Sequence, residues 1–116
     1  MSRPTFTFQT PYAKYENCVF RTGYYKNGNV GIWIEQIGGA GPICDVTCYV
    51  PEKLGEGEIA VKDWSENSGM NNWLKLFGWV EQEDPVRRIP SGFVEVPVQR
   101  MTKKLRDALS EDLRGL

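Results

Sequence analysis

The chain has 116 residues, 41% hydrophobic and 25% charged, with a formal net charge of −1. We expect one folded, soluble domain spanning residues 1–116, because domains cluster around about 100 to 150 residues. The near-zero charge argues against binding nucleic acid through bulk electrostatics, and the lack of histidine excludes Ser-His-Asp and Cys-His catalytic arrangements and His-containing zinc sites within one chain.

Thr5 to Gln9 reads as a first strand, and residues 17–37 predict a β-hairpin. Asn27-Gly28 supplies the two positive-φ positions of a type I′ turn, which would pair Tyr25 with Val30. One face of the hairpin would then carry Val19, Tyr25, Val30, Ile32 and Ile34, and the other Cys18, Phe20, Tyr24 and Trp33. Because both faces are substantially apolar, we expect the hairpin in mid-sheet, with its aromatic face covered or open to a partner.

Later segments predict further strands separated by loops. Residues 38–42 read as a flexible glycine-rich turn, residues 43–50 as a strand, and residues 58–62 as a short strand. Residues 82–90 are predicted to be a surface excursion, and residues 93–98 a strand that Pro97 places at an edge.

Two segments predict helices. Met70, Trp73, Leu74 and Phe77 fall on one helical stripe, and Gly78 is a natural C-terminal cap with Trp79 able to pack back on the last turn. The end of the chain, residues 100–113 within a C-terminal region of 99–116, also has a helical pattern. We therefore predict an α+β fold: an antiparallel sheet of about five to six strands, packed by one central amphipathic helix, plus a C-terminal helix.

The cysteines and the missing targeting signals indicate the compartment. No apolar run approaches the roughly 18 residues of a membrane helix, and the N-terminus lacks a signal-peptide stretch. The three cysteines, Cys18, Cys44 and Cys48, favour reduced thiols. We expect a cytoplasmic protein, in the host-cell cytoplasm if a phage encodes it. Small buried residues explain these cysteines better than a metal site completed by a carboxylate, so no metal or cofactor is predicted.

The turn before the first helix concentrates polar side chains. Asp63, Ser65, Glu66 and Asn67 have the composition of a metal-binding or acid-base patch. Capping is the stronger interpretation, with Ser65 or Asn67 accepting from the first N–H groups of the helix and Glu66 near the positive end of its dipole. Since no catalytic constellation is evident elsewhere, we predict that the protein is not an enzyme.

The run Lys62-Asp63-Trp64-Ser65-Glu66-Asn67, followed by Gly69-Met70 and Trp73-Leu74, resembles a small domain-of-unknown-function family from bacterial plasmids, conjugative elements and phages. The preceding Asn-Gly-Asn hairpin is also similar, and together they cover about residues 20 to 80. The resemblance implies mobile-element residence. By association, it suggests inhibition of a host defence complex such as a CRISPR effector, in the manner of anti-CRISPR proteins.

Two binding hypotheses follow. The first is a protein-protein interaction with a host protein or complex, motivated by surplus aromatic residues and by a charge of −4 on residues 1–84, which carry seven basic and eleven acidic side chains. Its predicted contacts are Tyr24, Tyr25 and Trp33, with an acidic patch of Glu52, Glu56, Glu58 and Asp63. The alternative is an accessory protein that binds nucleic acid through its basic C-terminal region, using Arg87, Arg88, Arg100, Lys103, Lys104 and Arg106.

Overall fold

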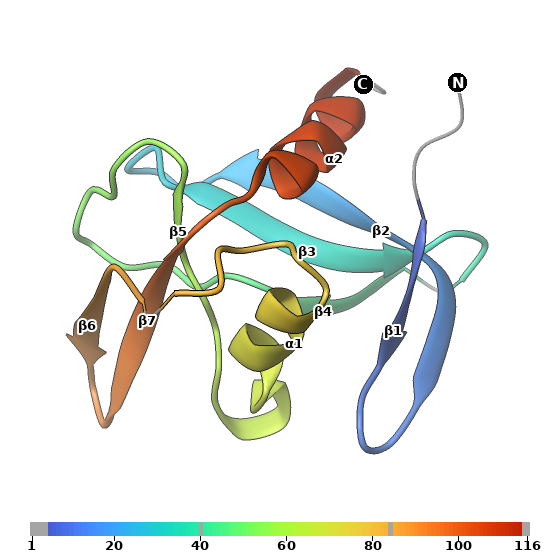
Figure 1. Ribbon diagram of the computed structural model, residues 1–116, viewed down its shortest axis with the longest axis horizontal. Helices are drawn as coiled ribbons and strands as arrows, with labels where there is room; N and C mark the ends of the chain where they lie inside the picture. The colour runs from blue at the N-terminus through green and yellow to red at the C-terminus, as the bar shows by residue number, and fades with distance from the viewer. Residues whose placement is uncertain (1–4, 40, 84, 115–116) are drawn as a thin grey trace.

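The computed structural model describes residues 5–39, 41–83 and 85–114, and of residues 113 and 114 only the backbone. In the described residues, seven strands and two α-helices make an α+β fold, which confirms the predicted class (Figure 1). The strands are β1 (Phe6–Gln9), β2 (Lys14–Tyr24), β3 (Val30–Gln36), β4 (Pro42–Asp45), β5 (Glu58–Ala60), β6 (Arg87–Ser91) and β7 (Val94–Arg100). The helices are a 3-10 turn (Ser65–Asn67), α1 (Met70–Leu76) and α2 (Lys103–Arg114).

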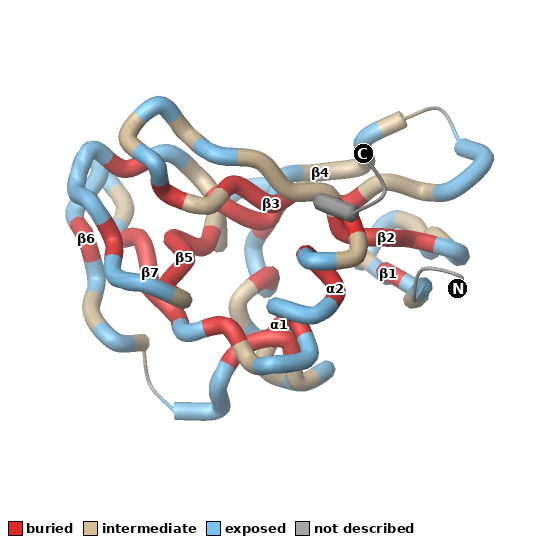
Figure 2. The backbone as a smooth tube through the Cα atoms, turned by 90° about the horizontal axis from the view of Figure 1, so that it is seen from above, coloured by how far each residue is buried: buried red, intermediate tan, exposed pale blue. Residues whose placement is uncertain are grey.

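The strands form two antiparallel sheets rather than the single layer expected. Four strands lie in the order β1-β2-β3-β4 and three in the order β5-β7-β6. An isolated bridge between Thr47 and Val61 links the segments that leave β4 and β5. Both helices lie on one side of the four-stranded sheet, as Figures 1 and 2 show together. No described helix is long and apolar enough to cross a membrane.

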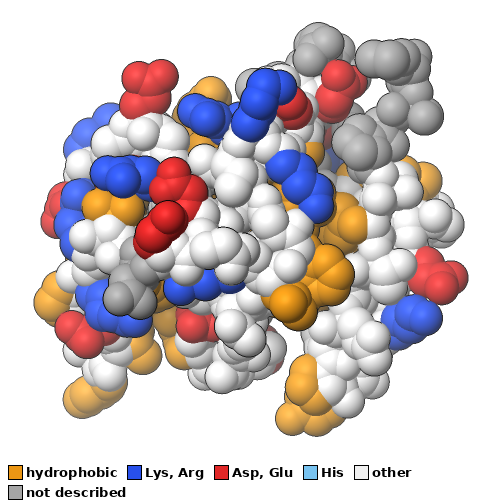
Figure 3. Space-filling view, viewed as in Figure 1, with side chains coloured by type: hydrophobic (Ala, Val, Ile, Leu, Met, Phe, Trp, Pro, Cys, Tyr) orange, Lys and Arg blue, Asp and Glu red, His pale blue; other side chains and the backbone are white. Residues whose placement is uncertain are grey.

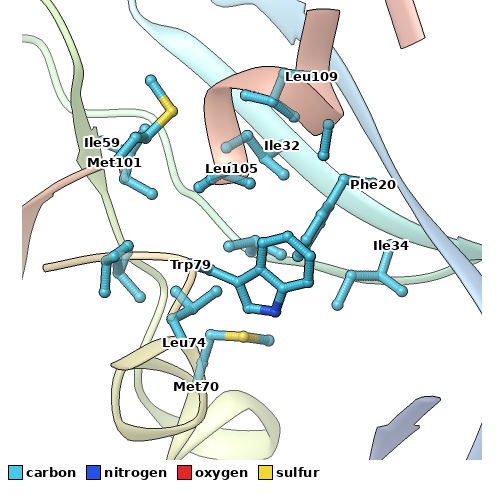
Figure 4. Close-up of a cluster of buried hydrophobic side chains, with 14 of the residues drawn as sticks. Phe20, Ile32, Ile34, Ile59, Met70, Leu74, Trp79, Met101, Leu105 and Leu109 are labelled. Carbon is cyan, nitrogen blue, oxygen red and sulfur yellow. The ribbon is translucent and has the colours of Figure 1, made fainter. Parts of the chain in front are cut away.

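The main core fills the space between this sheet and the two helices. Phe20, Ile32 and Ile34 from β2 and β3 meet Leu74 of α1 and Leu105 of α2, and all five are buried (Figure 4). A smaller core belongs to the three-stranded sheet and consists of Val50, Leu54, Ala60, Ile89, Val96 and Val98. Burial of the first cluster is what holds α1 and α2 against the sheet, since apolar burial contributes about 25 cal/mol per Å².

The β2–β3 hairpin has the predicted strands but a different register. Tyr24, not Tyr25, pairs with Val30. Of the predicted Asn-Gly pair only Gly28 has a positive φ, 88°, and the N–H of Tyr25 donates to the carbonyl of Asn29 at 2.9 Å. The connection is therefore a three-residue loop with a glycine bulge, instead of the two-residue type I′ turn.

This one-residue difference regroups the faces of the hairpin, because neighbouring residues of a strand point to opposite sides. Phe20 now pairs with Ile34, so Cys18 and Phe20 share the buried face with Ile32 and Ile34. Trp33 pairs with Arg21 and points to the opposite side of the sheet. The prediction that Phe20 and Trp33 share an aromatic face was wrong.

Several element boundaries also differ from the prediction, and β7, predicted to lie at an edge because of Pro97, is the middle strand of its sheet. Strand β4 ends at Asp45 rather than continuing to residue 50, because the hydroxyl of Thr47 accepts from the N–H of Ile32 at 2.9 Å and the chain then turns away. Residues 82–90, expected to be a surface excursion, include most of β6. Arg100 belongs to β7, where it pairs with Glu58, and α2 begins only at Lys103.

The C-terminal end of α1 confirms one prediction and corrects another. Gly78 has a φ of 75°, and the N–H of Trp79 reaches back to the carbonyl of Leu74 at 2.9 Å, which together form a Schellman cap. Phe77, predicted to lie on the buried stripe, is 49% exposed. It occupies the C-cap position, one residue beyond the helix, where the helical period no longer turns it to the core.

Candidate functional site

A groove of about 590 Å³ runs between the edge of β1 and the C-terminal end of α1. One wall consists of β1 residues and of residues on either side of β1, namely Thr5, Phe6, Thr7, Gln9, Thr10 and Pro11. The other wall consists of Trp73, Phe77, Trp79 and Lys104. We call this feature the β1–α1 groove. In the view of Figure 3, hydrophobic side chains gather beside the β1–β2 hairpin, and the outline of the molecule is indented below them.

The apolar wall of the groove is held in place by ring contacts. The ring of Phe8 meets that of Trp73 edge-on, with centroids 5.0 Å apart, and Phe6 lies 5.5 Å from Trp79. Trp73 is also 5.6 Å from Phe77. Such ring pairs contribute about 0.5–1.5 kcal/mol beyond area burial. The wall is therefore built by the fold and does not need a ligand to form.

Lys104 is the only charged residue on the described lining of the groove. Its ammonium lies 4.0 Å from the centroid of the Trp79 ring, and it donates a hydrogen bond to the carbonyl of Phe77 at 2.7 Å. Among the described residues no carboxylate forms an ion pair with it. The groove thus combines an aromatic wall with one positioned cation at its rim.

A second cleft of about 440 Å³ continues past Trp73 toward the N-terminal end of α1. It shares Gln9, Thr10 and Pro11 with the β1–α1 groove and is also lined by Tyr12, Ile43, Cys44, Glu66, Ser68 and Met70. Tyr12, at the tip of the β1–β2 hairpin, is 92% exposed. The hairpin therefore forms one side of a continuous apolar depression.

The aromatic residues predicted as partner contacts lie elsewhere, on the β2–β3 hairpin. Tyr24 is 69% exposed, which fits a contact residue. Tyr25 is half-buried, with its hydroxyl 3.1 Å from that of Thr47 and its ring 5.8 Å from that of Tyr49. Trp33 is half-buried over Gly23. None of these three predicted residues lines the β1–α1 groove.

The predicted acidic patch is dispersed and partly neutralised. Glu52 and the buried Glu58 both pair with Arg87, the latter at 3.6 Å. Glu56 is exposed in the same connector. Asp63 lies at the other end of β5, where it caps α1. Of the four residues, Glu56 is therefore the exposed carboxylate that forms no ion pair within the described part of the chain.

The Asp63–Asn67 turn caps the helix, but through a different residue than predicted. Oδ1 of Asp63 accepts from the N–H groups of Gly69 and Asn71 at 3.0 and 3.2 Å. Ser65 instead has a positive φ of 54°, and the side-chain amide of Asn67 donates to the carbonyls of Asp45 and Lys62. The predicted caps were wrong because the 3-10 turn moves both side chains away from the start of α1.

The carboxylate of Glu66 already interacts with neighbouring groups. Its pKa is lowered, first by a hydrogen bond from its own backbone N–H and then by Lys62, whose ammonium lies 3.3 Å away. Within the described residues no three Cys, Asp or Glu side chains gather closely enough to hold a metal ion. The acid-base or metal interpretation of this turn gains no support.

The predicted nucleic-acid contacts come from three elements. Arg87 and Arg88 lie on β6, Arg100 ends β7, and Lys103, Lys104 and Arg106 lie in the first turns of α2. Arg87 is paired with Glu52 and Glu58, Lys103 is paired with Asp107 at 2.8 Å, and Lys104 lies at the groove. The set does not form one uniform basic stripe.

All three cysteines are free thiols. Burial, followed by the charge of Asp45, raises the pKa of Cys44 to about 11, and burial likewise raises the pKa of Cys18 and Cys48. The thiolate is the reactive form of cysteine, and a raised pKa disfavours it. These side chains therefore act as packing residues and are poor candidates for nucleophiles.

Comparison of the chain with protein-family models, with curated proteins and with solved structures finds no match. The resemblance to a mobile-element family stays a prediction.

Proposed function

We propose that this protein acts by binding another protein, and that the β1–α1 groove is the contact surface. The observation that carries the proposal is the aromatic wall of Trp73, Phe77 and Trp79 facing the edge of β1, with Lys104 at the rim. Aromatic side chains, tryptophan above all, are enriched in protein interfaces and in their hot spots. The exposed Tyr12 and Phe77 widen the apolar area that a partner would cover.

A binding role is favoured over catalysis by what lies in the groove. Its lining offers aromatic rings, threonine and glutamine side chains and one ammonium, without a carboxylate or thiol beside them in the described residues. General acid-base or nucleophilic chemistry needs at least one such group within hydrogen-bond reach of another. The proposed role is therefore that of an adaptor or inhibitor rather than that of an enzyme.

Matched variants test the groove directly. The tagged full chain would be used to capture proteins from a bacterial host lysate in parallel with F77A and F93A variants. Phe77 lines the groove, whereas Phe93 is a fully exposed ring in the β6–β7 turn that does not. We expect a protein that wild type and F93A recover equally and F77A loses. Equal recovery by all three, or recovery of no protein, would contradict the proposal.

The finer proposal is inhibition of a host defence complex by a phage-encoded or mobile-element protein, in an anti-CRISPR-like manner. It is supported by the resemblance of residues 62–74 and not by the groove itself. Expression of the chain in a host whose CRISPR system targets a phage should restore plaque formation, and F77A should restore less than F93A. Plaque counts unchanged by the wild-type chain would count against that target.

The alternative, binding of nucleic acid through Arg88, Arg100 and Arg106, is supported by their exposure. It would give oligonucleotide affinity that falls steeply with salt and is lost on reversing these three charges. The pairing of Arg87 and Lys103 with carboxylates makes this the weaker proposal.

A further inference from the structure

We propose that the occupant of the β1–α1 groove is an extended peptide segment of the partner that adds to the open edge of β1 as a further strand. A bulky apolar side chain of the segment enters between Trp73, Phe77 and Trp79, and a carboxylate of the segment meets Lys104. This inference rests on the proposed function, because it specifies how the same groove would bind a protein.

The edge of β1 is the first argument. In the sheet order β1-β2-β3-β4, β1 is an end strand and, among the described residues, pairs on one side only. The N–H of Thr10 donates to the carbonyl of Ala13 at 2.8 Å, so the N–H of Phe8, two residues earlier, also points toward β2. Because successive N–H groups of a strand alternate in direction, those of Thr7 and Gln9 point away from β2, and both residues line the groove. An unpaired row of donors and acceptors is a template for another strand.

The opposite wall supplies the specificity. Side chains of an added strand alternate, so every second one would point across the groove toward α1. There Trp73 is fixed by the ring of Phe8, while Phe77 is half-exposed and Trp79 closes the far side. This arrangement accepts a large aliphatic or aromatic side chain, and Lys104 is the one charged residue on the described lining beside it.

The charge of Lys104 is the reason for placing a carboxylate on the segment. Lys104 is the one described cation on the lining, is held by the carbonyl of Phe77 at 2.7 Å, and forms no ion pair with a described carboxylate. Glu66, in the neighbouring cleft, is already paired with Lys62 at 3.3 Å. A carboxylate on the segment would therefore find an ammonium that is positioned but not neutralised.

The probe is a phage-displayed library of linear random peptides, panned against the full chain. We expect enriched sequences with a large apolar residue near an acidic residue. Isothermal titration with the best synthetic peptide should show that K104E and F77A weaken binding at least about tenfold, while R106E and F93A change it less than about twofold. Arg106 is the matched control, since it is an exposed cation on the same helix away from the groove.

Backbone methylation of the peptide distinguishes strand addition from other modes. N-methylation removes one peptide N–H at a time. If the segment pairs with β1, alternate positions should abolish binding and the intervening ones should tolerate methylation. Amide exchange of Thr7 and Gln9 should slow on binding. Equal tolerance at every position, or unchanged exchange of both amides, would overturn the proposal.

The remaining outcomes separate this inference from the proposed function. If no linear peptide is enriched yet F77A still loses a captured protein, strand addition fails and the groove stands. If the enriched peptide binds F77A and K104E as well as wild type, the groove itself is wrong as the binding site. Self-association of the free chain through β1 would replace the partner segment by a second copy and so overturn the proposal.

Discussion

Asp112, near the end of α2, accepts a hydrogen bond from the backbone N–H of Thr22 on β2 at 2.9 Å. Its other carboxylate oxygen pairs with Arg21 at 2.9 Å, and Arg21 also pairs with Glu35 on β3. Thr22 lies beyond the part of β2 that pairs with β1. The carboxylate of Asp112 therefore accepts from a backbone N–H that β1 does not reach. The C-terminal helix is thereby fixed to a strand edge.

The D112A variant should lose about 2–3 kcal/mol of unfolding free energy, because it removes a buried charged acceptor and leaves the Thr22 N–H unsatisfied. Urea unfolding measures the loss, and faster amide exchange at Thr22 should accompany it. The control is D107A on the same helix, whose exposed ion pair with Lys103 contributes at most about 0.5 kcal/mol. Equal losses in the two variants would refute the role of Asp112.

Asp63 gives a second prediction. Its carboxylate caps α1 by accepting from Gly69 and Asn71, so D63A should lower the unfolding free energy by about 1 kcal/mol. D63N keeps an acceptor oxygen and should lose less. S65G is expected to be neutral or stabilising, because Ser65 has a positive φ that glycine adopts more readily. A large loss in D63N with none in D63A would be inconsistent with capping.

Part of the fold could be predicted because its signals are local. The stripe of Met70, Trp73 and Leu74 and the cap at Gly78 depend on helical spacing and a single glycine conformation. The hairpin register could not be predicted in the same way. Asn27-Gly28 is compatible with both a two-residue and a three-residue loop, and the choice depends on what Asn29 binds outside the hairpin.

The groove was not predictable from sequence, because its walls come from segments about 65 residues apart. Phe6 and Phe8 alternate in a short strand, which indicates one apolar face but not that it meets Trp73. The residue that could have indicated the groove is Phe77. It lies just past the end of α1, so helical periodicity overestimates the burial of its ring. The prediction of Tyr24 and Trp33, by contrast, rests on a shared aromatic face of the hairpin, which the observed register does not form.

Asn29 supports the third prediction. Its side chain is buried, donates to the carbonyl of Glu52 at 2.9 Å and accepts from the N–H of Leu54 at 2.9 Å. N29A should therefore cost about 2–3 kcal/mol in urea unfolding, since both backbone groups of the connector lose their partner. N72A is the control, because Asn72 is exposed on α1. A loss below about 0.5 kcal/mol in N29A would show that the connector does not depend on this anchor.

Cys44 supports a prediction on pH. Burial raises its pKa to about 11 from an ordinary value of 9.0, so at pH 8 the native thiol should react with iodoacetamide about 100-fold more slowly than in the urea-unfolded chain. Peptide mapping by mass spectrometry gives the rate at each pH. The native rate should keep rising up to about pH 11, whereas the rate in the unfolded chain should level off near pH 9.

The same shift sets the sign of a stability effect. Because the folded chain holds the thiol proton more tightly than the unfolded chain, protonated Cys44 contributes stability below pH 9 that is lost progressively as pH rises toward about 11. The raised pKa values of Cys18 and Cys48 act in the same direction. Between about pH 8.5 and 10.5, C44A should therefore lose less unfolding free energy than the wild type. This range covers most of the interval between the pKa of the unfolded thiol, 9.0, and that of the folded thiol, about 11. An identical alkaline decline in C44A would show that this thiol does not titrate with folding.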